Sequence, residues 1–199
     1  MTEPQTEQQA RWDRRYQSRQ EAGEPCSVLA DNLHLLSAGA HCLDLASGLG
    51  ANALTLAGLG FTTEAWDIST VALQKLAQWA QIQRVALSTR VVDVEMQPPT
   101  AASFDVIVVS QFLHRPLFPA LIAALRPQGL LFYQTFHQQK ISGAGPSSAD
   151  YLLAPGELLT LTAPLRPLFY REDGRTGDQH QGRRDCAYLV AIKEPTDAA

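Results

Sequence analysis

The residues best suited to bind a ligand form a glycine-containing loop after a short apolar run. The apolar residues 41–46 lead into Ser47-Gly48-Leu49-Gly50, and a helix-like stretch follows at 51–58. Closely spaced glycines let a backbone approach a ligand without intervening side chains. The first turn of the next helix adds free N–H groups and the positive end of its dipole. Such a loop suits a nucleotide or a carboxylate, although a tight turn without any ligand would have a similar sequence.

Acidic residues accompany three successive strand-like segments. Asp44 lies near the end of the first, Asp67 ends the second, and Asp93 ends the third. Ligands of open α/β sheets bind at the carboxyl ends of the strands, where an acid can accept hydrogen bonds from ribose hydroxyl groups. Three acids at one edge repel one another unless the ligand supplies donors or positive charge. A ligand with an ammonium group and a sulfonium meets this requirement. The alternative for Asp67 is a helix cap.

A second interpretation of the same loop is dinucleotide binding. Gly48, Gly50 and Ala53 satisfy the fingerprint G-x-G-x-x-G/A. An NAD-binding oxidoreductase is therefore an alternative. Against it stand Asp44, which a pyrophosphate would not favour, and the absence of a Tyr-x-x-x-Lys pair or a second catalytic domain.

The order of the expected elements favours an α/β domain with a doubly wound, mostly parallel seven-stranded sheet. Helix-like segments at 10–20 and 26–36 come first. The expected strands are at 41–46, 63–66, 88–94, 104–110, 130–136, 165–170 and 187–192, and the helices between them are at 51–58, 70–84 and 116–125. No helix fits between the last two strands, so the sheet is expected to end in an antiparallel hairpin. The loop 140–150 has the composition of a lid or of a mobile loop.

Composition places the chain among ordinary globular proteins. Its 199 residues are 45% hydrophobic and 18% charged, with a net charge of −4, which suits one domain and disfavours nucleic acid as a partner. The cysteines Cys26, Cys42 and Cys186 have neither disulfide nor metal-ligand spacing, so no metal site is expected. The polar start at 1–10 is unlike a signal peptide, and no apolar run reaches the roughly 20 residues of a membrane span. We therefore expect a cytoplasmic protein with no membrane partner.

The segment Asp44-Leu45-Ala46-Ser47-Gly48-Leu49-Gly50 resembles the first motif, D-x-G-x-G-x-G, of class I S-adenosylmethionine-dependent methyltransferases, with Ala46 in place of the first glycine. The resemblance implies a Rossmann-like methyltransferase fold from about Trp12 onward, with S-adenosylmethionine as cofactor. It also implies that Asp67 binds the ribose and that Asp93-Val94 contacts the adenine. The cofactor-binding residues expected in this way are Arg15, Tyr16, Asp44, Ala46, Ser47, Gly48, Gly50, Asn52, Asp67, Ile68, Asp93, Val94, Ser110 and Phe112.

The run Trp12-Asp13-Arg14-Arg15-Tyr16 is similar to the W-[ND]-x-R-Y opening of tellurite-resistance-type and thiopurine-like small-molecule methyltransferases. In those families the opening helix lies over the cofactor. This implies that Arg15 pairs with the methionine carboxylate and that Tyr16 packs beside it. We expect residues 1–38 to form a helical cap and residues 39–199 the methyltransferase domain.

The sequence restricts the methyl acceptor mainly by what it lacks. Nucleic-acid amino-methyltransferases carry N/D-P-P-Y/F after the fourth strand, whereas this chain has Ser110-Gln111-Phe112-Leu113. A short chain without a substrate domain favours a small molecule, with a protein side chain as the alternative, and a monomer or homodimer. A soft anion such as a thiolate or a chalcogen oxyanion needs no general base. For a hydroxyl or a neutral amine, His114 is the candidate catalytic base. A non-catalytic protein that binds S-adenosylmethionine is the remaining alternative.

Overall fold

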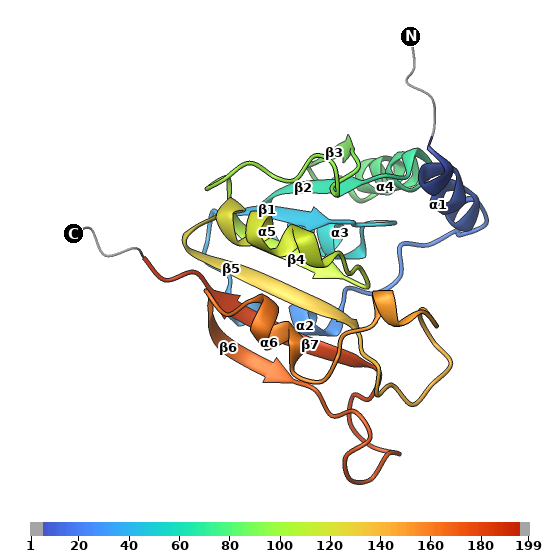
Figure 1. Ribbon diagram of the computed structural model, residues 1–199. Coiled ribbons are helices and arrows are strands. Elements are labelled where there is room, and N and C mark those ends of the chain that lie inside the picture. Colours follow the sequence, from blue (N-terminus) through green and yellow to red (C-terminus); the bar gives the residue numbers. More distant parts are fainter. Residues whose placement is uncertain (1–5, 196–199) are drawn as a thin grey trace.

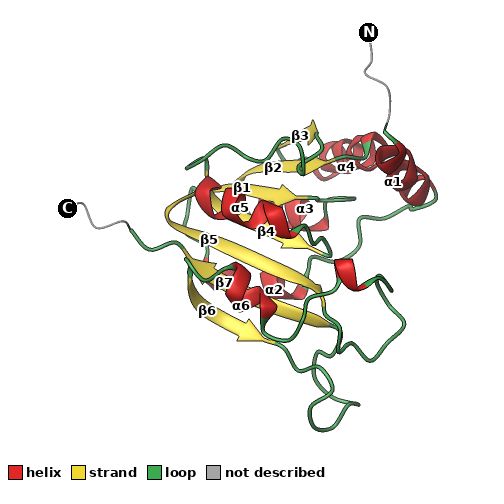
Figure 2. Ribbon diagram, in the orientation of Figure 1, coloured by secondary structure: helices red, strands yellow, loops and turns green. Residues whose placement is uncertain are grey.

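Seven strands form one sheet in the order β3-β2-β1-β4-β5-β7-β6 in the computed structural model, which describes residues 6–195. The strands are β1 (His41–Leu45), β2 (Thr62–Asp67), β3 (Leu87–Val91), β4 (Phe104–Ser110), β5 (Leu125–Phe136), β6 (Arg166–Arg171) and β7 (Cys186–Ile192). Strand β7 runs antiparallel to both β5 and β6, and the other neighbours are parallel (Figure 2). The expected mostly parallel sheet with an antiparallel terminal hairpin is therefore confirmed.

Helices cover both faces of this sheet, with α5 and α6 on one face and α2, α3 and α4 on the other (Figure 1). The helices are α1 (Glu7–Gln17), α2 (Ser27–Ala30), α3 (Ala51–Gly58), α4 (Thr70–Gln83), α5 (Phe118–Ala124) and α6 (Glu157–Leu161). Three short 3-10 helices are η1 (Leu33–Leu35), η2 (Arg115–Leu117) and η3 (Ala149–Tyr151). Helix α1 lies beside α4 at one end of the sheet.

Strand β4 explains why the sequence shows a continuous apolar run at this point. Ile107 and Val109 belong to the core cluster that includes α5, whereas Val106 and Val108 belong to the cluster that includes α2 and α3. Successive side chains of a strand point to opposite faces, and both faces are covered here. All four side chains are consequently buried.

Several boundaries differ from the expectations for local reasons. The first helix begins at Glu7 because Thr6 caps it, its side chain accepting from Gln9 N–H at 3.1 Å. The segment 26–36 is not one helix but α2 followed by η1. There the Asn32 side chain donates to the Val28 carbonyl at 2.9 Å, and such side chains compete with regular helical bonding. Strand β5 starts at Leu125, five residues before the expected strand.

Strand β3 ends at Val91, so Asp93 lies beyond the strand rather than at its end. Its carbonyl accepts from Met96 N–H and Gln97 N–H, and its side chain accepts from Glu95 N–H at 3.0 Å. Asp93 therefore begins a turn. The polar start at 1–10 lies partly outside the described residues, as do the outer limits of the expected division into 1–38 and 39–199.

Candidate functional site

The loop between β1 and α3 turns through three residues with positive φ. Ala46, Gly48 and Gly50 have φ of 53°, 54° and 75°. The left-handed conformation costs an ordinary L-residue roughly 1–2 kcal/mol. Ala46 thus adopts the backbone conformation for which the glycine of the D-x-G-x-G-x-G motif is better suited. The loop is tied to β2 by Ser47 N–H, which donates to the Trp66 carbonyl at 3.0 Å.

The two loop glycines allow neighbouring helices to pack directly on the backbone. A Cβ atom at Gly48 would lie 2.7 Å from the hydroxyl oxygen of Tyr16 in α1. A Cβ atom at Gly50 would lie 2.4 Å from a methyl carbon of Leu76 in α4. Both positions therefore combine a left-handed backbone with close approach.

Asp44 lies beneath the loop rather than on its surface. The side chain is fully buried and accepts from Asn52 Nδ2 at 3.2 Å and from Ala53 N–H at 3.1 Å. Burial raises the pKa of Asp44 to about 7, although both hydrogen bonds oppose this rise. Asn52 also donates to Ser110 Oγ at 3.3 Å and accepts from Cys26 N–H at 2.8 Å. Asp44 and Asn52 thus connect β1, β4 and the segment before α2.

The raised pKa of Asp44 predicts a protein that loses stability as pH rises from about 4 to 7. In this window the folded protein keeps a proton on Asp44 that the unfolded chain has released, so the free energy of unfolding falls with pH. The fall amounts to roughly 4 kcal/mol at most for this group. Urea unfolding without cofactor at several pH values measures it. Asp44→Asn should flatten the profile and Asp31→Asn, at an exposed ion pair with Arg183, should not. Parallel profiles for Asp44→Asn and the unaltered protein would contradict the assignment.

Asp67 links the glycine loop to the start of α4. One carboxylate oxygen accepts from Gly48 N–H at 2.7 Å and the other from Ser69 N–H at 2.8 Å. Burial raises the pKa of Asp67, and these two bonds oppose the rise. Ser69 caps α4 through its own side chain, which accepts from Ala72 N–H at 3.1 Å. Asp67 is therefore both a structural tie and a carboxylate at the surface of the cleft described below.

Helix α1 covers the loop and is fastened to α4 at several points. The Asp13 carboxylate accepts from Ser69 Oγ at 2.5 Å and from Val71 N–H at 3.1 Å. Lys75 Nζ donates to the carbonyls of the last turn of α1 and of Arg19. Trp12 and Tyr16 stack with ring centroids 5.7 Å apart. The helix therefore places Tyr16 against Gly48, and Trp12, stacked on Tyr16, also lines the cleft described below.

One cleft brings most of the expected site residues together. Its volume is about 1190 Å³. Of the expected cofactor-binding residues it is lined by Arg15, Tyr16, Ala46, Ser47, Gly48, Gly50, Asn52, Asp67, Ile68, Asp93, Val94, Ser110 and Phe112. The structure does not bring Asp44 or His114 to its surface. Four residues that were not expected at the site also line the cleft: Trp12, Gln111, Gln134 and Phe136.

Among the residues that the structure describes, the part of the cleft beyond β1 is lined by no charged side chain. Because β4 and β5 follow β1 in the sheet order, it lies on the side away from Asp67 and Asp93. We call this part the uncharged wall, and its residues are Ser110, Gln111, Phe112, Leu113, Gln134, Thr135, Phe136, Ala144, Gly145, Pro146 and Tyr151. Gln111 has φ of 54°, and strained backbone of this kind is often found at functional sites. No sequence pattern predicts the left-handed conformation of Gln111, because the surrounding structure imposes it.

His114 does not line the cleft, although its ion-pair partner Glu95 does. Its Nδ1 is 3.5 Å from a carboxylate oxygen of Glu95, and the side chain is partly exposed. Cys26 lines the cleft, and burial raises the pKa of its thiol to about 12. Glu21 and Glu24 also line the cleft, and both residues are exposed to solvent. Among residues 6–195, no group of three or more His, Cys, Asp or Glu is placed to hold a metal ion, and no helix could cross a membrane.

A comparison with protein-family models decides between the interpretations of this loop. Residues 42–129 match the model described as a methyltransferase domain. This matched segment indicates an S-adenosylmethionine-dependent methyltransferase. Its methyl donor is S-adenosylmethionine, so the NAD-binding alternative is not favoured. The match includes the glycine loop, Asp67 and Asp93. A search of curated proteins returns no match.

Solved structures show the same fold around this domain. TehB from Haemophilus influenzae is 18% identical, with a TM-score of 0.70 over 94% of this chain and 67% of that chain. A structure described under conversion of a disulfide bond into a thioacetal group during echinomycin biosynthesis is 16% identical, with a TM-score of 0.72 over 94% and 93%. The [4+2]-cyclase SpnF is 17% identical, with a TM-score of 0.67 over 85% and 79%. The TM-scores, at these low identities, show a shared Rossmann-like methyltransferase fold and no more, and the cyclase illustrates that the fold alone does not fix the reaction.

The residues of the methyltransferase domain fit S-adenosylmethionine. The Ser47 hydroxyl is buried and has no hydrogen-bond partner among residues 6–195, so it is available to a ligand. The left-handed glycines leave the loop backbone accessible, and Asp67 lies beside it. When bound, the cofactor supplies a methyl group already activated on sulfur. The chain has to bind it, orient the acceptor and exclude water.

Replacing Arg15 with alanine tests the part of the site in α1. If its guanidinium pairs with the methionine carboxylate, Arg15→Ala should weaken S-adenosylhomocysteine about tenfold or more and leave adenosine affinity unchanged. Arg14→Ala, in the same helix but not lining the cleft, is the matched control. Calorimetric titration with both ligands measures the difference. Equal weakening of both ligands would mean that Arg15 acts elsewhere.

Proposed function

We propose that this chain transfers the methyl group of S-adenosylmethionine to a small molecule that carries a soft, anionic nucleophile, such as a thiolate or a chalcogen oxyanion. The observation that carries the proposal is the uncharged wall. It contains no His, Asp, Glu, Lys or Arg side chain among the described residues. An acceptor bound there therefore finds no general base on that wall.

The other groups near the wall are also poor bases. The thiol of Cys26 stays protonated at neutral pH because burial raises its pKa. His114 does not line the cleft, and its Nδ1 is 3.5 Å from Glu95, which does line it. A hydroxyl or a neutral amine would need its proton removed, whereas a thiolate arrives without one. The similar structure linked to thioacetal formation also concerns chemistry at sulfur, which supports this choice.

The acceptor class is tested with matched sulfur and oxygen compounds. The purified protein is incubated with S-adenosylmethionine and hydrosulfide, phenylmethanethiol or phenylmethanol. We expect methylation of both thiols and none of the alcohol. Because no protein base takes part, kcat/KM should rise with pH in parallel with the thiolate fraction. Methylation of the alcohol alone, or binding of S-adenosylhomocysteine without transfer to any acceptor, would contradict the proposal.

The role of His114 is tested by His114→Asn in the same assay. We expect kcat/KM for the thiols to change less than twofold, since the acceptor needs no base. Glu95→Gln removes the ion-pair partner of His114, and it should likewise change kcat/KM for the thiols less than twofold. A decrease in kcat/KM of about tenfold or more in His114→Asn would instead indicate that His114 transfers a proton, since general acid–base catalysis raises rates by about 10²–10⁴-fold. That result would favour an oxygen or nitrogen acceptor.

A further inference from the structure

The segment between β5 and α6 supplies part of the uncharged wall. We call residues 138–152, between β5 and α6, the strap. Ala144, Gly145, Pro146 and Tyr151 from the strap line the cleft. The strap therefore bounds the end of the cleft that, under the proposed function, receives the acceptor.

One end of the strap is held by Asp185, the residue before β7. One oxygen of its carboxylate accepts from Ile141 N–H at 2.9 Å and from Ser142 N–H at 3.0 Å, and the other accepts from Ser142 Oγ at 2.5 Å. In addition, His137 N–H donates to the Asp185 carbonyl at 3.2 Å. A single side chain thus fixes two successive backbone groups of the strap.

The other end of the strap is held by Arg115, in η2. Its guanidinium donates to the Asp150 carbonyl at 2.6 Å and to the Leu152 carbonyl at 3.0 Å. The same guanidinium forms a two-bond ion pair with Glu157, at 2.6 and 2.9 Å. Bidentate pairs of this kind have a fixed geometry. The strap is therefore anchored at both ends, and residues 144–146 between the anchors line the cleft.

The middle of the strap rests on an aromatic ring. Gly145 has φ of 74°, and a Cβ atom there would lie 2.7 Å from three ring carbons of Phe136. Phe136 itself lines the cleft. Close contact between the Gly145 backbone and the Phe136 ring therefore sets how far the strap stands from the end of β5.

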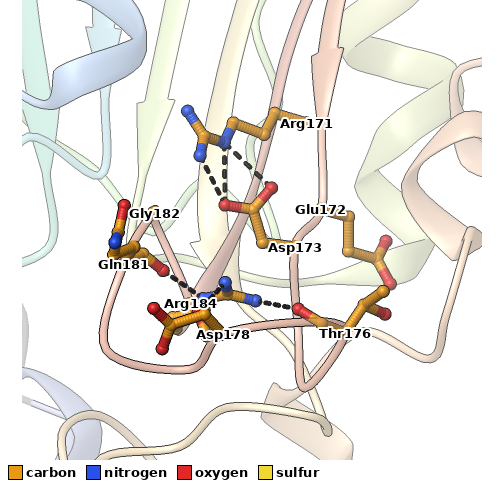
Figure 3. A pocket seen from close by; sticks show the side chains of 8 residues that line it. All are labelled: Arg171, Glu172, Asp173, Thr176, Asp178, Gln181, Gly182 and Arg184. Atoms are coloured by element: carbon orange, nitrogen blue, oxygen red, sulfur yellow. Dashed lines mark hydrogen bonds and ion pairs between the residues drawn. The ribbon is translucent and has the colours of Figure 1, made fainter.

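The loop that precedes Asp185 keeps this anchor in place. Arg184 donates to the carbonyls of Thr176, Asp178 and Gln181, and Arg171 pairs with Asp173 (Figure 3). Arg184 also donates to the Gly174 carbonyl at 3.2 Å. These charged groups line a shallow polar pocket, but their hydrogen bonds are made within the loop. The arrangement stabilises the loop and positions Asp185 rather than presenting free groups to a ligand.

We propose that the strap is a fixed wall that selects acceptors by size, with Gly145 and Phe136 as specificity-determining residues and Asp185 as a positioning residue. This inference rests on the proposed function. An acceptor that extends past the reacting atom meets the Phe136 ring and the strap backbone. Compact acceptors fit between the glycine loop and this wall, whereas larger ones must displace an anchored segment.

The first experiment compares kcat/KM for hydrosulfide with kcat/KM for phenylmethanethiol. Phe136→Ala should raise the relative rate of the larger thiol about tenfold, since removing the ring opens space at the wall. Phe169→Ala, at a partly buried ring in β6 away from the cleft, is the control. Asp185→Asn should raise KM for both thiols with a smaller change in kcat, while S-adenosylhomocysteine affinity is unchanged. An unaltered ratio in Phe136→Ala would overturn the size selection.

The second experiment does not depend on activity. Hydrogen exchange of the S-adenosylhomocysteine-bound protein should be about tenfold faster or more at Ile141 and Ser142 in Asp185→Asn than in the unaltered protein. Asp178→Asn, in the same loop but with its bond directed to His180 N–H, should leave the strap unchanged. Equal exchange in both variants would overturn the role of Asp185. If S-adenosylhomocysteine binds but no thiol is methylated, the proposed function is wrong. The hydrogen-exchange comparison still tests whether Asp185 holds the strap, because it does not require activity.

Discussion

Asp67→Ala is expected to weaken S-adenosylhomocysteine binding by about 10- to 150-fold, because hydrogen bonds from the ribose hydroxyls to a carboxylate contribute roughly 1.5–3 kcal/mol. The carboxylate lies at the cleft surface next to Gly48. Calorimetric titration of the folded variant measures the loss. An unchanged affinity would contradict the ribose assignment.

Asp67→Ala also removes two structural bonds, so its effect on stability needs a matched control. Gly48 N–H and Ser69 N–H lose their acceptor, and each buried, unpaired donor costs about 1–3 kcal/mol. Asp105→Ala is suitable because Asp105 also accepts from a backbone group, His41 N–H at 2.8 Å, and lies at the opposite end of its strand. It should lower stability without changing cofactor affinity. Where Asp67→Ala fails to fold, Asp67→Asn keeps one acceptor oxygen and serves the same comparison.

Gly50→Ala is expected to lower the free energy of unfolding by about 2–5 kcal/mol. The left-handed backbone at φ of 75° costs an L-residue roughly 1–2 kcal/mol. The new methyl group also displaces Leu76, whose methyl carbon would lie 2.4 Å away, and overpacking costs about 1–3 kcal/mol. Urea unfolding at constant pH measures the sum.

Two further variants separate the terms. Gly39 has φ of 76° but no atom within 4 Å of an added Cβ, so Gly39→Ala carries the backbone cost alone. Combining Gly50→Ala with Leu76→Ala should cost less than the sum of the single changes, because the two side chains compete for one space. Equal effects of Gly50→Ala and Gly39→Ala, or strict additivity with Leu76→Ala, would show that Leu76 does not press on the loop.

The sequence predicts the sheet and the cofactor loop because both depend on local signals. The alternation of apolar runs with helical segments specifies a parallel sheet, and in β4 each face is covered as the run implies. The loop is recognisable because Gly48 and Gly50 occupy left-handed positions that few other residues tolerate. Asp67 is also predictable from a local signal, because it is the last residue of the strand that follows the loop in sequence.

Other parts of the site depend on contacts between distant segments. The sequence places Asp44 near the end of β1. Only the structure shows that its side chain is fully buried beneath the loop. His114 is adjacent in sequence to wall residues, yet its side chain turns toward Glu95. The strap has the composition of a loop, and its anchors Arg115 and Asp185 come from other elements. No local pattern encodes such pairings.

Helix α1 has no buried residue, although it covers the glycine loop. Its attachment consists of part-buried hydrogen bonds with α4, made chiefly by Asp13 and by Lys75, and of the contact between Tyr16 and Gly48. Lifting this helix would break no strand pairing, so it requires only local opening rather than global unfolding. We therefore expect spent cofactor to leave beneath α1 while the sheet stays folded. The residence time of the product would then depend on how strongly α1 is bound to α4.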